Sequence, residues 1–141
     1  MIVISCLDKG NGMLFHNRRQ SRDREVKARI QQICKGKKLW MNHYSSRLYG
    51  GMDSVETAVS DSFMLEAGDG DFCFVESDML TPFEEDIEVI IVFRWDRKYP
   101  ADFHMDLELS GWEKIRVRGF PGYSHETITE EIYVKGNKGY V

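Results

Sequence analysis

Short, almost wholly apolar runs constrain the fold of this chain more than any other feature. Ile87–Phe93 is nearly all apolar, and Phe72–Val75 forms a second compact apolar run. Such runs are typical of strands that are covered on both faces. The chain also opens on an apolar run, Ile2–Leu7, which predicts a first buried strand. Because these strands need cover on both sides, the pattern predicts a layered α/β fold.

One amphipathic helix is expected after the first strand. Four apolar residues share a helical stripe: Val26, Ile30, Ile33 and Cys34. The stripe predicts a helix over about residues 22–34, with Ser21 as its N-cap and Gly36 just beyond its end.

The rest of the chain alternates short strands with short helices. Further strands are expected over residues 38–41, 55–59, 112–117 and 127–134, short helices over 61–67 and 81–86, and irregular backbone over 13–20 and 44–54. This order predicts a mixed sheet with helices on both faces and antiparallel C-terminal strands.

Length and cysteine usage limit the class of protein. The 141 residues suit a single domain, 1–141. The three cysteines form no Cys-x-x-Cys pair, so we expect free thiols in a reducing, cytoplasmic compartment. No apolar run approaches the roughly 18 residues of a membrane span, and the first residues lack the pattern of a signal peptide.

The charge is unevenly distributed. Residues 18–38 carry nine basic and two acidic side chains, a net +7, whereas the whole chain carries −4. The residues expected to bind an anion are Arg18, Arg19, Arg22 and Arg29. Three interpretations stay open: a solvated helix face, an anion site, or a nucleic-acid surface. The segment has no interleaved aromatic residue, which argues against single-stranded nucleic acid.

Several motifs, taken in order, are similar to those of a known family. They are Ile2–Leu7 followed by Asp8 and Gly12-Met13, the stretch Cys34–Met41 after the basic helix, and Asp102–Asp106 ahead of Trp112. In this order the chain resembles the dihydrofolate reductases over most of its length. The resemblance implies their mixed-sheet fold, NADPH as cofactor, hydride transfer to a pterin-like ring, and a monomer or homodimer.

The chain departs from that family where the cofactor would bind. The family has Gly-Arg-x-Thr after its second strand, and here Asn42–Arg47 stands instead. His43, Ser45 and Arg47 could still contact an anion. The family's Gly-Gly after the central strand is replaced by Glu76-Ser77. A carboxylate repels phosphate, and a Cβ blocks close approach of the backbone. Reduction by NADPH is therefore an open question.

The acid that assists protonation in this family has two candidates here. Asp23 and Glu25 lie near the start of the basic helix. The alternative is that both only complement the helix N-terminus and its arginine neighbours.

No other constellation predicts a site. The four histidines have no helical metal-binding spacing, so we expect no metal site. Gly122–Glu126 offers a serine, a histidine and an acid close together, but without a strand–turn–helix setting we interpret it as a loop.

These observations leave three functional hypotheses. The first is a divergent reductase-like protein that binds a small pterin-like, nucleotide or other anionic ligand. The second is a non-catalytic module whose basic helix binds an anionic partner. The third is an assembly protein that pairs through an exposed final strand, Thr127–Val134.

Overall fold

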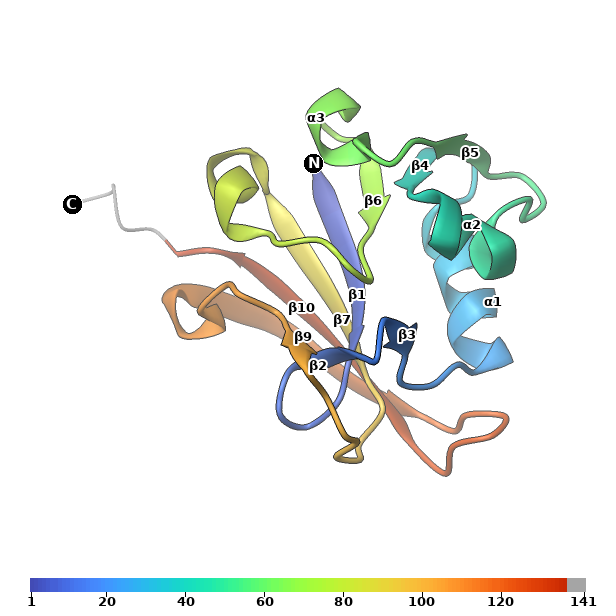
Figure 1. The fold of residues 1–141 in the computed structure, drawn as a ribbon, viewed down its shortest axis with the longest axis vertical. Coiled ribbons are helices and arrows are strands. Elements are labelled where there is room, and N and C mark those ends of the chain that lie inside the picture. Colours follow the sequence, from blue (N-terminus) through green and yellow to red (C-terminus); the bar gives the residue numbers. More distant parts are fainter. Residues whose placement is uncertain (137–141) are drawn as a thin grey trace.

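A seven-stranded mixed sheet organises the molecule (Figure 1). A computed structural model describes residues 1–136. The strands, in spatial order, are β5 (Glu56–Val59), β4 (Lys38–Met41), β6 (Phe72–Phe74), β1 (Ile2–Leu7), β7 (Val89–Arg94), β10 (Ile128–Lys135) and β9 (Trp112–Phe120). The predicted strands are confirmed, with bounds that shift by at most three residues.

The first strand lies at the centre of the sheet. β1 runs parallel to β6 on one side and to β7 on the other, with Ile2 opposite both Phe72 and Val89. β10 is antiparallel to both β7 and β9. The predicted antiparallel C-terminal strands are confirmed, but the last strand is interior and β9 forms the edge. The expectation of an exposed strand over 127–134 is therefore wrong.

A second, three-stranded sheet follows the first strand. It joins β3 (Arg18–Arg19), β2 (Gly12–Phe15) and β8 (Phe103–His104). Residues 13–20 were expected to be irregular, yet His16 and Asn17 both adopt positive φ and close a tight β2–β3 turn. This hairpin places the side chain of Arg19 near the carboxyl ends of the large sheet.

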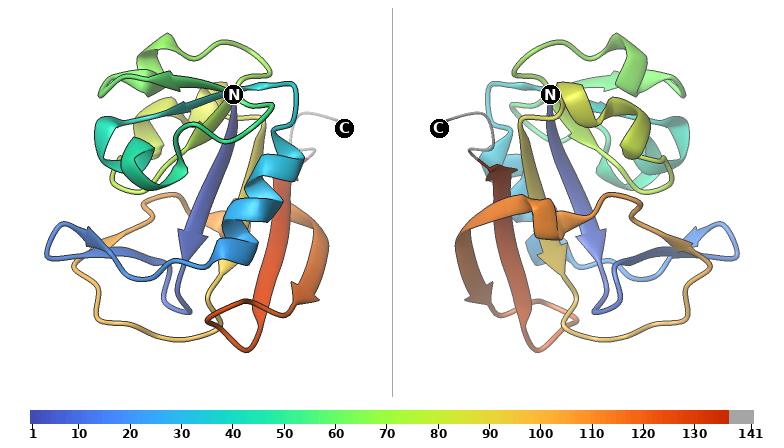
Figure 2. Two further views of the ribbon diagram at one scale, coloured as in Figure 1. Left: turned by 90° about the vertical axis from the view of Figure 1, so that its right-hand side faces the viewer. Right: turned by 90° about the vertical axis from the view of Figure 1, so that its left-hand side faces the viewer.

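Helices cover both faces of the large sheet, as predicted (Figure 2). On one face lie α1 (Arg24–Ile33) and α2 (His43–Tyr49), which bury Val26, Ile30 and Tyr49. On the other lie α3 (Phe63–Glu66) and the 3₁₀ turn η1 (Thr81–Asp86), with the second 3₁₀ turn η2 (Leu109–Gly111) near the edge.

Two helix starts differ from expectation. Asp23, not Ser21, caps α1, because its carboxylate accepts the N–H of Glu25. Helix α2 occupies the first part of the expected irregular stretch 44–54, as far as Tyr49, since the Asn42 side chain accepts the N–H of Ser45 and supplies a cap.

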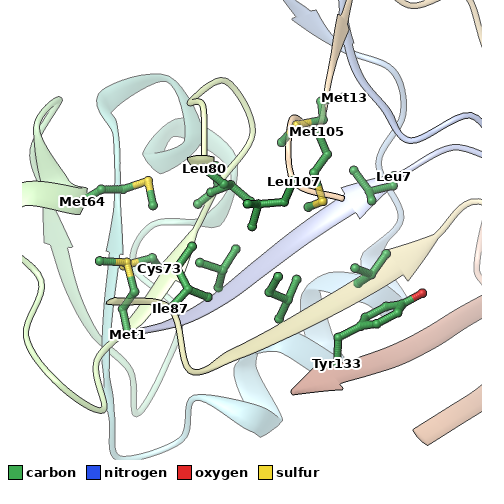
Figure 3. Close-up of a cluster of buried hydrophobic side chains, with 14 of the residues drawn as sticks. Met1, Leu7, Met13, Met64, Cys73, Leu80, Ile87, Met105, Leu107 and Tyr133 are labelled. Carbon is green, nitrogen blue, oxygen red and sulfur yellow. The ribbon is translucent and has the colours of Figure 1, made fainter. Parts of the chain in front are cut away.

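Separate apolar clusters fill the two faces of the sheet. Figure 3 shows the cluster on the α3 side, where Met1, Met64 and Cys73 pack at one end and Leu7 and Met105 at the other. Cys34 lies in the opposite cluster beneath α1. All three cysteines are free thiols. No helix within residues 1–136 has the length and apolar character needed to cross a membrane.

Candidate functional site

Polar side chains gather where the parallel strands end. β1, β4 and β6 finish at the same edge of the sheet, and Asp8, Asn42 and Glu76 follow these strands. In open α/β sheets this edge is where ligands bind. The connection from β3 to α1, residues 19–23, crosses the same region, with Arg19 and Asp23 at its two ends.

The first cluster is built on a buried ion pair. The guanidinium of Arg19 donates to both oxygens of Glu76, with Nε–Oε2 at 2.8 Å and Nη2–Oε1 at 2.9 Å. The hydroxyl of Ser45 donates to Glu76 Oε1 at 2.7 Å. The Tyr44 ring lies 4.5 Å from the guanidinium carbon of Arg19. We call Arg19, Tyr44, Ser45 and Glu76 the Arg19 cluster.

The Arg19 cluster satisfies its own charges. Glu76 is 7% exposed and Ser45 is fully buried. A bidentate guanidinium–carboxylate pair is the strongest geometry for such a contact. The hydrogen bond that Arg19 donates to Glu76 raises the pKa of Arg19, against the opposing effect of burial. The Glu76 carboxylate is thus committed to Arg19 and Ser45.

The residues after β6 do not fit the pyrophosphate of a dinucleotide. A pyrophosphate needs close backbone approach and donors, whereas Glu76 brings a buried carboxylate and Ser77 brings a Cβ. Arg19, the cation that contacts Glu76, is already paired with it. These residues therefore do not fit the pyrophosphate of NADPH.

The other residues expected at a cofactor site are dispersed. Ser77 accepts a hydrogen bond from the Asn42 amide at 2.9 Å. His43 faces Asp61 at the surface, with Nδ1 and Oδ1 3.0 Å apart. Arg47 is exposed on α2. Only Ser45 and Glu76, among the five residues expected there, touch each other.

A second cluster surrounds Asp23. Its carboxylate accepts the backbone N–H groups of four residues: Glu25, Tyr123, Ser124 and His125. Nδ1 of the His125 ring lies 2.9 Å from Asp23 Oδ2, and Nε2 lies 2.8 Å from Ser21 Oγ. The hydroxyls of Ser124 and Tyr99 also approach the ring. We call Ser21, Asp23, Tyr99, Ser124 and His125 the Asp23 cluster.

Hydrogen bonding keeps Asp23 ionised. Burial alone would raise the pKa of Asp23, but the N–H of Tyr123, the His125 ring and the N–H of Glu25 outweigh it and hold that pKa well below its usual range. Asp23 is therefore a poor proton donor near neutral pH. Glu25, the other candidate acid, is exposed on the first turn of α1.

A glycine lets the β9–β10 turn close around Asp23. A Cβ on Gly122 would lie 2.7 Å from Asp23 Oδ2 and 2.7 Å from the carbonyl oxygen of His125. Both distances are shorter than side chains tolerate, so the turn holds Asp23 this tightly only because residue 122 lacks a side chain.

Asp8 ties the loops around both clusters together. It accepts the N–H groups of Gly10, Gly12 and Tyr99 and the amide of Gln20. Burial would raise the pKa of Asp8, but the N–H groups of Gly12 and Tyr99 lower it overall. This carboxylate fixes Tyr99 beside the Asp23 cluster and Gln20 beside Ser21.

The arginines of the basic segment have different partners. Arg29 is bound by the buried carboxylate of Glu130, with Nε–Oε1 at 2.7 Å. Arg18 and Arg19 line a hollow of about 560 Å³ with Tyr99 and Pro100. Arg22 is exposed and lines a different hollow, at the N-terminus of α1.

That second hollow has a more apolar lining than the 560 Å³ hollow. It has a volume of about 440 Å³ and lies between α1, α2 and the β9–β10 turn. Its lining consists of Arg22, Asp23, Arg24, Lys27, Leu48, Tyr49, Tyr123 and Ser124. The Arg24 guanidinium carbon lies 3.6 Å from the centre of the Tyr123 ring. We call this opening the α1 hollow.

Sequence reasoning missed the parts of the site that come from distant segments. Tyr49 and Tyr123 line the α1 hollow, and neither was singled out. The nearest sequence cue to Tyr49 was Asn42 followed by Ser45, which predicts a helix start and hence α2. The contact of His125 with Asp23 joins residues that are 102 positions apart, and no local pattern predicts it.

Comparison with known proteins identifies the architecture. No family model matches this chain, and no curated protein matches its sequence. Among solved structures, a dihydrofolate reductase from Enterococcus faecalis, complexed with NADP(H) and RAB-propyl, superposes with a TM-score of 0.67. The match covers 96% of each chain at 10% identity. The protein therefore has the dihydrofolate reductase fold.

Proposed function

We propose that the protein binds a small anionic molecule with an apolar or aromatic body in the α1 hollow. The observation that carries this proposal is the convergence of Arg22, Arg24 and Lys27 on one hollow whose opposite wall is Leu48 and Tyr49. Cations on one side and apolar surface on the other match a ligand with a carboxylate or phosphate on a planar or aliphatic frame.

The charges of the hollow are available to a ligand. Within residues 1–136, none of the three cations forms an ion pair with a carboxylate of the protein. The Asp23 carboxylate at the floor is engaged by four backbone N–H groups and His125. An entering anion therefore meets a positive local potential.

The proposal leaves out hydride transfer from NADPH. The fold is that of a reductase, but Glu76 and Ser77 stand where a pyrophosphate would need donors. A nucleic-acid surface is also set aside, because Arg19 and Arg29 of the basic segment are paired to Glu76 and Glu130.

Calorimetric titration with naphthalene-2-sulfonate tests the proposal, with uncharged 2-naphthol as the matched ligand. We expect saturable binding of the sulfonate that weakens as salt rises, and weaker binding of the naphthol. The double variant Arg22→Glu with Lys27→Glu should lower affinity about tenfold or more.

The control makes the same charge change at the other end of the helix. Lys35→Glu with Lys37→Glu alters two exposed lysines beyond α1 and away from the hollow. Affinity should stay within about twofold of the starting protein. Equal weakening by both double variants, or no binding by the starting protein, would refute an α1-hollow site. Titration with a DNA duplex and with NADPH shows whether either competes.

A further inference from the structure

Three side chains of the Asp23 cluster form a continuous chain of contacts. Ser21 lies between β3 and α1, Asp23 caps α1, and His125 lies in the β9–β10 turn. Ser21 Oγ is 2.8 Å from His125 Nε2, and His125 Nδ1 is 2.9 Å from Asp23 Oδ2. The imidazole thus bridges a hydroxyl and a carboxylate through its two nitrogens.

The direction of the hydrogen bonds follows from the chemistry of the groups. An ionised carboxylate only accepts, so the hydrogen on His125 lies at Nδ1 and points to Asp23. In the neutral ring Nε2 then carries a lone pair, and the Ser21 hydroxyl donates to it. This is the arrangement in which a histidine can remove the proton of a serine.

The capping of α1 does not require this arrangement. Asp23 already receives four backbone N–H groups, and these satisfy the cap and fix the β9–β10 turn. The contact of Nε2 with Ser21 adds nothing to those bonds. A structural role for Asp23 therefore leaves the Ser21–His125 contact unexplained.

The imidazole is held in a fixed orientation. Its ring stacks on Trp95, with ring centres 4.7 Å apart and planes 22° apart. His125 is 6% exposed, and Trp95 is 2% exposed. The hydroxyl of Tyr99 lies 3.3 Å from Nε2, on the side of the reacting nitrogen. Rigid support of this kind is what a catalytic base needs.

Ser21 is the reachable member of the three. It is half-buried, whereas Asp23 and His125 are buried. Its neighbour Arg22 lines the α1 hollow, and its neighbour Gln20 lines the 560 Å³ hollow together with Tyr99. Ser21 therefore lies on the backbone between two openings, both bordered by cations.

We infer that Ser21, His125 and Asp23 are a nucleophilic triad that hydrolyses carboxylic esters. Ser21 Oγ attacks the ester carbonyl carbon while its proton passes to His125 Nε2. The C–O bond to the alcohol breaks, and the alcohol leaves with that proton. Water then attacks the acyl-serine, gives a proton to Nε2, and releases the acid while Ser21 regains its hydrogen. The sum is ester plus water to acid plus alcohol.

The class of ester follows from the charges, and this part rests on the proposed function. Arg22, Arg24 and Lys27 line the hollow that begins at the residue after Ser21, and Arg18 lines the hollow that includes the residue before it. The substrate is an ester that carries a second, anionic group, either carboxylate or phosphate. The nucleophile itself does not depend on the anion site.

A fluorophosphonate probe with mass-spectrometric peptide mapping tests the nucleophile. The full-length protein should form a covalent adduct on Ser21. Ser21→Ala and His125→Gln should both reduce labelling to background, while Ser110→Ala, which alters an exposed serine in η2, should label as the starting protein does. Thermal melts identify any variant that fails to fold.

Ester hydrolysis then tests the substrate class. The p-nitrophenyl monoester of glutarate should be hydrolysed faster than p-nitrophenyl acetate, and Ser21→Ala should lose on the order of 10³-fold in rate. An unlabelled protein, or an adduct on any residue other than Ser21, overturns the triad. Labelling of Ser21 without a preference for the anionic ester keeps the triad and refutes the anion site.

Discussion

The Arg19 cluster and the Asp23 cluster lie at the two ends of one five-residue connection, and they use a buried carboxylate in opposite ways. Glu76 is neutralised by a guanidinium and a hydroxyl that point only at it. Asp23 is held by backbone N–H groups, which leaves its histidine partner free to bind a second group through Nε2. The hydrogen-bond network ends at Glu76, whereas at Asp23 it continues through His125 to Ser21.

The difference shows how a ligand-binding edge can be remodelled within one fold. Toward β6, the side chains of Arg19, Ser45 and Glu76 pair with each other, so that region contributes stability. Toward α1, the side chains border a hollow of about 440 Å³ and a half-buried hydroxyl. We therefore expect substitutions in the Arg19 cluster to affect folding more than binding, and the reverse around Ser21.

The largest expected effect is the loss of Glu76. Glu76→Ala leaves the Arg19 guanidinium without its partner and Ser45 without an acceptor. The free energy of unfolding, measured with urea, should fall by about 3 kcal/mol or more. Glu56→Ala is the control, because Glu56 is 72% exposed and 3.8 Å from Lys38, and it should cost less than about 0.5 kcal/mol. Equal losses would contradict the view that the Arg19 cluster is a buried structural element.

A somewhat smaller effect is expected from filling the turn around Asp23. Gly122→Ala puts a methyl group 2.7 Å from Asp23 Oδ2 and should cost about 2 kcal/mol in the same unfolding experiment. Gly119→Ala, where the new carbon has 3.9 Å of clearance, should be close to neutral. If Gly122→Ala is also neutral, the β9–β10 turn is looser than the four N–H bonds imply.

Deleting one hydroxyl from the Arg19 cluster and one from the Asp23 cluster sharpens the comparison of the two. Ser45→Ala removes a buried donor to an ionised carboxylate and should cost about 1.5 kcal/mol. Ser21→Ala removes a half-buried hydroxyl that water can replace, and should cost about 0.5 kcal/mol or less. Urea unfolding of both variants measures which one loses more free energy of unfolding. A larger loss for Ser21→Ala would assign Ser21 a structural role.

The last expected effect is a dependence of the stability on pH in acid. The pKa of Asp23 is lowered in the folded state, so its contribution to stability is complete above the ordinary aspartate pKa and is lost as the pH falls below that value. One such group accounts for a slope of at most about 1.4 kcal/mol per pH unit. Thermal melts of the starting protein and of Asp23→Asn between about pH 5 and pH 3 should show a flatter slope for the variant.

The central strands of the sheet could be predicted because each one is marked by a local run of apolar residues. The apolar runs around Val3, Cys73 and Ile91 predict central strands, and they lie beside one another in the sheet. The helices were harder to predict from the sequence. α2 has no apolar stripe, and it forms because Asn42 caps it and Tyr49 packs on Phe74, with ring centres 4.3 Å apart.

The site could be predicted only one residue at a time. Glu76 stood out because it replaces a glycine of the resembled family, and Asp23 because it begins the basic helix. The partner of each is distant in sequence: Arg19 is 57 positions from Glu76, and His125 is 102 positions from Asp23. These pairs exist because the β2–β3 hairpin and the β9–β10 turn fold toward the same edge of the sheet, which no local pattern specifies.

The connection from Arg19 to Asp23 is a short segment that is anchored at both ends. Its first residue is locked to Glu76 and its last to the β9–β10 turn, so neither end can swing without breaking buried bonds. A short span pinned in this way has few conformations to lose when a ligand arrives, and association there carries little entropic penalty. The same rigidity means that this connection itself does not act as a mobile flap over the opening.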